Sequence, residues 1–137
     1  MNTLSSIFAK FFLFNFLIFS TLLVTAANRY WVVPYNTGNW NSTSSWSAGY
    51  QGSPGASVPG PSDQVYFTGS NGSCSINATV DVAGITIYNY NGVITQNNYE
   101  VTTALYSQDG PYGRFTGGSQ DLNVTGSFTL LGGVFTA

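Results

Sequence analysis

Five carboxylates are the side chains best suited to acid–base chemistry in this 137-residue chain, which has no histidine. A glycoside hydrolase needs two carboxylates on opposite sides of one bond, and a lyase needs a base with cations nearby. The acids here lie far apart along the chain, and serine chemistry would lack its usual base. We therefore expect no enzyme activity, no cofactor and no metal site. The five are Asp63, Asp81, Glu100, Asp109 and Asp121.

Two of these acids have a simpler role as turn residues. Asp63 follows a Pro-Ser pair and Asp109 precedes Gly-Pro, contexts in which a short carboxylate accepts hydrogen bonds from nearby backbone N–H groups.

Cys74 is the only cysteine, so no internal disulfide exists, and it is either buried or available to a partner chain. Because Cys74 alternates with Ile76, we expect both to face one core.

An aromatic group near residue 40 supports two hypotheses. Its rings could form a flat surface that stacks on sugars, with Trp40, Trp46 and Tyr50 as the binding residues of a carbohydrate-binding module. Alternatively, Trp40 and Trp46 cover the open end of a stack of β coils, which would otherwise expose its apolar interior. The covering role is the favoured prediction. The group consists of Tyr30, Trp31, Tyr35, Trp40, Trp46 and Tyr50.

Charge is sparse, and hydroxyl and amide side chains supply most of the polarity. Charged residues make up 6% of the chain and the net charge is −2, or −3 after residue 27 because Lys10 lies before it. This charge balance excludes electrostatic binding of nucleic acid or of anionic lipid.

Four Asn-x-Ser/Thr sequons offer glycosylation positions at exposed sites. They begin at Asn41, Asn71, Asn77 and Asn123.

The first 26 residues have the pattern of a secretory signal peptide. An apolar run of 14 residues, 11–24, follows Lys10 and ends at small residues around Ala26. The run is shorter than the roughly 20 residues that span a bilayer. The prediction is a secreted protein, extracellular or at the cell surface, that contacts membrane only through this segment. The alternative is an uncleaved anchor, with the rest of the chain still facing outward.

The rest of the chain divides into two parts. Residues 27–62 form an aromatic segment rich in Gly and Pro, which predicts turns and an N-terminal cap. Residues 63–137 alternate β-branched or aromatic residues with polar ones in short runs, and no helical stretch is evident. Strands of three to five residues favour an all-β fold of the β-solenoid or parallel β-helix type, with a sandwich as the alternative. The expected strands are 30–33, 65–67, 74–76, 79–82, 85–88, 93–95, 99–103, 122–124, 128–130 and 134–136.

Several phrases resemble the start of secreted, adhesin-like parallel β-helix proteins. The resemblance covers residues 28–137 and rests on loose motifs made of common turn residues. It implies an N-terminal cap followed by coils that repeat along a β-helix. The phrases are Gly38-Asn-Trp40, Ser45-Trp46, Val58-Pro-Gly-Pro-Ser-Asp-Gln-Val65, Ile85-Thr-Ile87, Val124-Thr-Gly-Ser-Phe-Thr129 and Gly132-Gly-Val-Phe-Thr136.

These observations predict a non-catalytic extracellular structural or adhesive protein. A short solenoid with few charges exposes strand edges and apolar side chains, so we expect self-association into a fibre or surface assembly. The contact would run head to tail, from Val134 and Phe135 of one copy to Trp31 and Val33 of the next. In the carbohydrate-binding alternative the partners are cell-surface or matrix glycans. A third class is part of an enzyme whose catalytic coils lie beyond residue 137.

The leader pattern gives a first testable prediction. Because small residues occupy the positions that signal peptidase reads, the exported protein should begin near Ala27 or Asn28. Intact-mass analysis of exported protein checks this. Finding residues 1–10 still attached would contradict cleavage and favour the anchor.

Overall fold

The computed structural model describes residues 25–137, so the predicted leader at 1–24 lies outside the described residues. Strands fall into two sheets, joined by turns and one short 3-10 helix, η1 (Thr43–Ser45). No helix within 25–137 is long and apolar enough to cross a membrane. The six-stranded sheet contains β1 (Asn28–Trp31), β3 (Trp46–Ser47), β4 (Gln64–Thr68), β6 (Val80–Tyr88), β8 (Val101–Asp109) and β10 (Leu122–Leu130). The five-stranded sheet contains β2 (Gly38–Asn39), β5 (Cys74–Ser75), β7 (Val93–Thr95), β9 (Arg114–Thr116) and β11 (Val134–Thr136).

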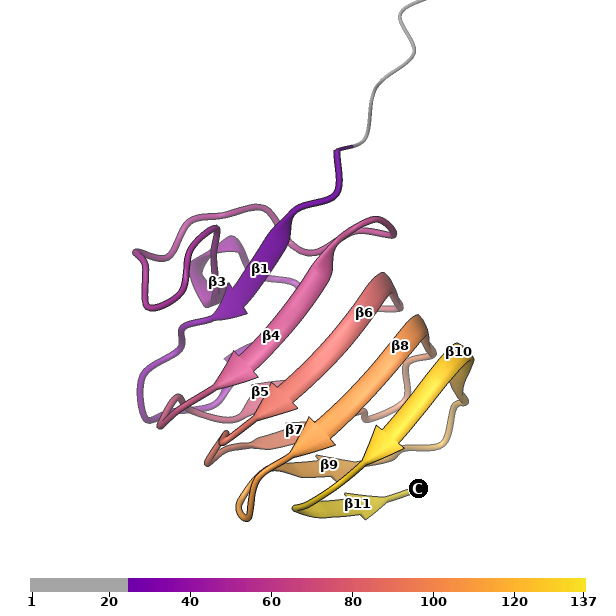
Figure 1. Ribbon diagram of the computed structural model, residues 1–137. Coiled ribbons are helices and arrows are strands. Elements are labelled where there is room, and N and C mark those ends of the chain that lie inside the picture. The colour runs from indigo at the N-terminus through magenta and orange to yellow at the C-terminus, as the bar shows by residue number, and fades with distance from the viewer. Residues whose placement is uncertain (1–24) are drawn as a thin grey trace, which may run out of the picture.

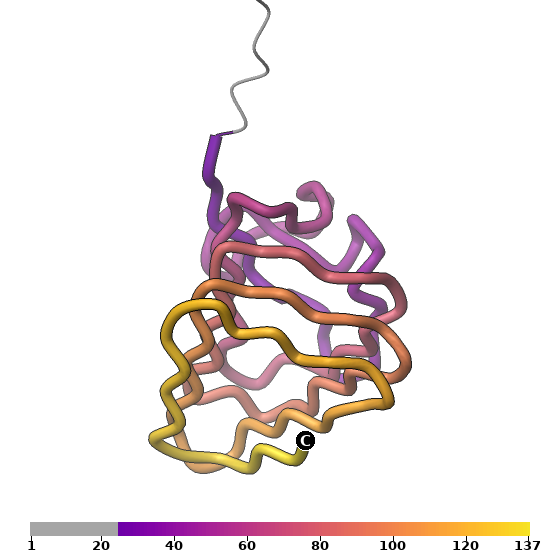
Figure 2. Tube along the Cα trace, turned by 90° about the vertical axis from the view of Figure 1, so that its right-hand side faces the viewer, coloured from indigo at the N-terminus to yellow at the C-terminus, as the bar shows by residue number. Residues whose placement is uncertain are grey.

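The chain winds between the two sheets and advances by one strand in each sheet per coil. Thus β4 leads to β5, β6 to β7, β8 to β9 and β10 to β11, and each strand pairs in parallel with its counterpart in the next coil. Figure 1 shows the resulting ladder, and Figure 2 shows the coils stacked from the N-terminal to the C-terminal end. This is a β-solenoid. The predicted all-β solenoid fold is confirmed, and the sandwich alternative is not what forms.

The core lies between the two sheets and consists of columns of side chains in register. In the five-stranded sheet, Cys74, Ile94, Phe115 and Phe135 occupy equivalent positions, 20 or 21 residues apart. The rings of Phe115 and Phe135 stack with centroids 5.3 Å apart. Parallel pairing therefore converts a repeat in the sequence into continuous contact along the solenoid axis.

Amide side chains hold the turns of successive coils together. Asn97, which has a φ of 57°, donates from Nδ2 to the carbonyl oxygen of Ile76 in the preceding coil at 2.8 Å. Buried Gln108 donates to the carbonyl oxygens of Gly113 and Val134, at 3.0 and 3.3 Å, and so links two coils. These bonds satisfy backbone carbonyls where the chain leaves one sheet for the other.

The strands are longer than the sequence predicted. The expected strands 79–82 and 85–88 are one strand, β6, and 122–124 and 128–130 are both part of β10. Likewise, the expected strand 99–103 continues to Asp109 in β8. The short strands β2 and β3 and the strand β9 were missed. The limit of three to five residues is therefore wrong for β6, β8 and β10, which have nine residues each.

Cys74 is buried, as predicted, together with Ile76. Burial raises the pKa of the Cys74 thiol well above its usual value of 9.0, because the charged thiolate would lose its hydration. The same effect raises the pKa of Tyr106, and it raises that of Tyr90 with a smaller contribution from the neighbouring Cys74 charge. All three groups are thus held neutral by the fold.

This burial predicts both thiol reactivity and alkaline stability. Folded protein should not react with a thiol reagent at mildly alkaline pH, whereas protein in concentrated urea should react fully. Rapid labelling of folded protein would contradict the buried position.

The stability that comes from neutral Cys74 is present below pH 9.0 and should be lost as pH rises from there through the raised pKa. Urea unfolding across this range of pH measures the loss of stability.

Candidate functional site

The N-terminal end of the solenoid is closed by a cluster of tryptophans. Trp31, Trp40 and Trp46 are at most 2% exposed. Trp46 meets the other two edge to face, with ring centroids 5.1 Å from Trp31 and 4.9 Å from Trp40. Trp46 donates from Nε1 to the carbonyl oxygen of Trp40, and Trp31 donates to that of Gly72, both at 2.7 Å. All three rings are therefore packed, and the N–H groups of Trp31 and Trp46 have hydrogen-bond partners.

The segment after β3 lies over this cluster. Ala56 donates from its backbone N–H to the carbonyl oxygen of Trp46 at 3.0 Å, and the side chains of Ala56 and Val58 pack against the core. In Figure 1 the segment loops across the top of the molecule, beside β1 and β3. Its turn-rich composition suits a segment that covers an end instead of continuing a sheet.

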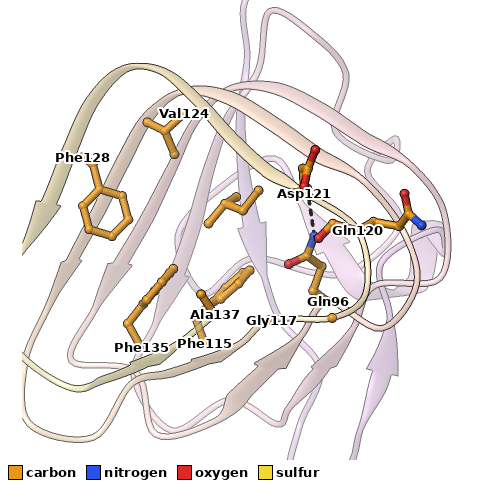
Figure 3. Close-up of a pocket in the computed structure, with 11 residues that line it drawn as sticks. Gln96, Phe115, Gly117, Gln120, Asp121, Val124, Phe128, Phe135 and Ala137 are labelled. Atoms are coloured by element: carbon orange, nitrogen blue, oxygen red, sulfur yellow. Dashed lines mark hydrogen bonds between the residues drawn. The ribbon is translucent and has the colours of Figure 1, made fainter.

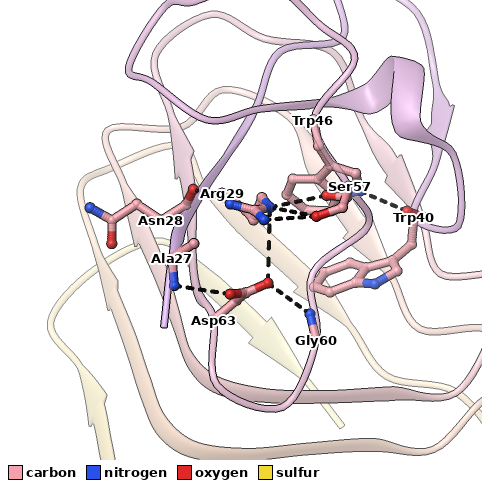
Figure 4. A network of polar contacts seen from close by, with 8 residues as sticks. All are labelled: Ala27, Asn28, Arg29, Trp40, Trp46, Ser57, Gly60 and Asp63. Atoms are coloured by element: carbon pink, nitrogen blue, oxygen red, sulfur yellow. Dashed lines mark hydrogen bonds and ion pairs between the residues drawn. The ribbon is translucent and has the colours of Figure 1, made fainter. Parts of the chain in front are cut away.

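Asp63 fastens the end of this covering segment, as Figure 4 shows. Its carboxylate accepts hydrogen bonds from the backbone N–H groups of Ala27 and Gly60, both at 3.0 Å. Arg29 lies 3.9 Å from the same carboxylate and also donates to the hydroxyl of Ser57. The prediction that Asp63 acts as a turn residue is confirmed. Asp109 behaves similarly and accepts a 2.7 Å hydrogen bond from the N–H of Gly110.

Burial of the tryptophans corrects one hypothesis. A sugar cannot stack on Trp40 or Trp46, because neither ring reaches the surface. The predicted carbohydrate-binding surface built on these two residues is therefore wrong, and their position fits the covering role. Tyr50 differs, since 61% of its surface is exposed.

The structure also contradicts the expected assembly contact through Trp31 and Val33 at the N-terminal end. β1 pairs on one side with β3 and on the other with β4, so it is not a free edge. Trp31 is buried, and Val33 is half-buried and packed against the core. Trp31 and Val33 therefore do not form an exposed assembly surface.

The C-terminal coil has a different character. A hollow of about 460 Å³ opens there. Figure 3 shows Phe115, Phe128 and Phe135 on one side of it, with Gln96 and Asp121 on the other. Gln96 donates to the carbonyl oxygen of Asp121 at 3.0 Å. The apolar interior of the last described coil is therefore partly open.

Exposed apolar residues lie on the same coil. Leu131 is 73% and Val134 47% exposed, while Phe135, which lines the hollow, is half-buried. Within residues 25–137, β10 pairs only with β8 and β11 only with β9, so each has one edge without a neighbouring strand. Of the predicted assembly residues, Val134 and Phe135 lie together at this end.

The four sequons have different surroundings. Asn41 and Asn123 are exposed. Asn71 is half-buried and donates from Nδ2 to the carbonyl oxygens of Trp31 and Thr68, both at 2.9 Å, whereas Asn77 accepts from the N–H of Asn41. Since a glycan is attached at Nδ2, modification of Asn71 would displace a turn contact. Asn123 also uses its Nδ2, on the Glu100 carboxylate at 2.7 Å, so Asn41 is the better-placed acceptor.

No group of three or more Cys, Asp or Glu residues within 25–137 is arranged to hold a metal ion.

The sequence-based reasoning missed two residues in the neighbourhood of Tyr50. Tyr66 stacks on Tyr30 with centroids 5.0 Å apart, and Gln51 adopts a φ of 53°. The alternation of Tyr66 with buried Val65 and Phe67 was the available signal for an outward-facing ring.

Comparisons of the chain with family models, with curated proteins and with solved structures gave no match.

The covering role of the tryptophans predicts a large effect of truncation. Trp46→Ala should lower the free energy of unfolding by about 3–5 kcal/mol, because it leaves a cavity under the covering segment. Tyr112→Ala is the control, since that side chain is 64% exposed. Urea unfolding measures both. A Trp46→Ala protein as stable as the control would contradict this role.

Proposed function

We propose that this chain is a non-catalytic, extracellular structural or adhesive protein that associates with a second copy of itself through its C-terminal coil. The observation that carries the proposal is the contrast between the two ends of the solenoid. Tryptophans and the covering segment close one end, whereas the last coil within residues 25–137 has a partly open apolar interior and carries the exposed residues Leu131 and Val134. Repeat proteins normally need polar surfaces at both ends to remain soluble alone.

The lengths of the edge strands favour contact between two C-terminal ends. At the N-terminal end the outermost strands are β3 and β2, with two residues each. At the C-terminal end, β10 has nine residues, and its outer edge can pair with another strand. Two copies related by a two-fold axis would place their β10 strands antiparallel and cover both hollows.

This arrangement differs from a head-to-tail fibre. A fibre would require the N-terminal end to accept the nine residues of β10, and the edge strand there, β3, has only two residues. An isologous contact closes after two copies and leaves both covered N-terminal ends facing outward. The leader pattern, the sequons and the sparse charge support an extracellular setting for such a pair.

The oligomeric state tests the proposal. We expect the mature chain to form dimers in light scattering, and Leu130→Lys with Val134→Lys to yield monomers, because charges at strand edges oppose pairing. Leu130 and Val134 are both exposed, so the substitutions should leave the fold intact. Phe135 is kept because it stacks on Phe115.

Tyr112→Lys is the control, since it adds a lysine to an exposed turn between β8 and β9, away from both edge strands. It should remain dimeric. A mature chain that stays monomeric at high concentration would overturn the proposal, as would a double variant that remains dimeric.

A further inference from the structure

A second hollow lies on the outer face of the six-stranded sheet, near the covered end. It has a volume of about 240 Å³ and is bounded by Val32 and Thr68 on the sheet side and by Tyr50 and Gln51 from the covering segment, with Asn71 and Ser70 at its edge. We call it the tyrosine groove. Pockets for drug-sized ligands measure roughly 300–1,000 Å³, so this groove suits a smaller group such as one sugar ring.

Neighbouring rings support the exposed wall of the groove. Tyr50 meets Tyr30 edge to face, with centroids 6.1 Å apart, and Tyr30 stacks on Tyr66 with an interplanar angle of 17°. Tyr30 and Tyr66 are paired residues on β1 and β4. The aromatic rings are confined to β1 and β4, because the positions paired with Tyr66 in the later strands of the sheet carry hydroxyl residues. These are Thr86, Ser107 and Thr129.

The backbone beside Tyr50 is held in an unusual conformation. Gln51 has a φ of 53°, in the left-handed region that non-glycine residues seldom adopt. The next residue, Gly52, lies so close to the Ser47 hydroxyl that a Cβ atom there would collide with it. Close packing of the segment on β3 therefore fixes Gln51 beside the Tyr50 hydroxyl, with its amide nitrogen 3.4 Å away.

The remaining lining is polar and carries no ionised side chain. Thr68 and Ser70 supply hydroxyls, and Gln51 supplies an amide. Asn71 uses its Nδ2 hydrogens on two backbone carbonyls, which leaves its Oδ1 as an acceptor. An ionic ligand would lack an opposite charge here, whereas a neutral ligand with many hydroxyls finds both donors and acceptors.

We propose that the tyrosine groove binds a neutral saccharide, with one pyranose ring stacked on Tyr50 and its hydroxyls bonded to Gln51, Thr68 and Asn71. One face of a pyranose presents C–H groups and packs against an aromatic ring, while its equatorial hydroxyls point toward the polar rim. This site differs from the tryptophan surface excluded above. It does not depend on the proposed self-association, because it lies at the opposite end of the six-stranded sheet from β10.

NMR titration of the mature chain tests the proposal. The chain is made without N-glycans, because Asn71 borders the groove. The probes are neutral tetrasaccharides of glucose, mannose, galactose and N-acetylglucosamine, and the same sugars as insoluble polysaccharides in a pull-down distinguish soluble from matrix glycans. We expect at least one probe to shift the amide signals of Gln51, Thr68 and Ser70.

Matched variants separate ligand contact from folding. Tyr50→Ala should raise the dissociation constant at least about tenfold through loss of stacking. Gln51→Gly keeps a backbone that tolerates positive φ and removes the amide, so it should also weaken binding without loss of stability. Tyr112→Ala should bind as the parent does. The proposal is overturned if no probe shifts these signals, or if Tyr50→Ala binds as tightly as the parent.

Discussion

A stack of parallel coils has two ends, and each end exposes the apolar interior of a coil unless something covers it. The rest of this structure depends on that constraint. At the N-terminal end, three tryptophans fill the interior and the segment through Val58 lies over them. Asp63 then fastens the chain where it returns to the sheet as β4. The aromatic and turn-rich character of 27–62 thus follows from one physical need.

Between the ends, parallel pairing determines which side chains can be tolerated. Each inward position meets its counterpart one coil away, so apolar side chains form continuous columns, while charges of one sign would repel along a column. Tyr106 and Phe128 stack in this way, with centroids 5.0 Å apart. Inward-facing polar side chains occur where their polar atoms form hydrogen bonds, as in Gln96 and Gln108. The sparse charge of the chain is consistent with these columns and with uncharged turn contacts.

The sequence predicted the class of fold better than the extent of its strands. Alternation indicated the all-β class and the burial of Cys74, because period two is a local property. Breaks were expected after residues 82 and 124, yet Gly84 and Gly126 lie inside nine-residue strands. At each, a Cβ would collide with the adjacent strand, with the Gln64 side chain or the Ala104 carbonyl oxygen. That close approach exists only after pairing. The antiparallel contact of β3 that buries Trp31 is equally non-local.

The segment that closes the N-terminal end serves two sides of the molecule. Its inner residues, Ala56 and Val58, pack on the core, whereas Tyr50 and Gln51 border the groove outside. Between them, a Cβ at Gly52 would collide with the Ser47 hydroxyl on β3, so the segment packs closely on that strand. Groups that are held in place before a ligand arrives lose less entropy on binding. Closure of the solenoid would therefore help to preorganise the proposed saccharide site.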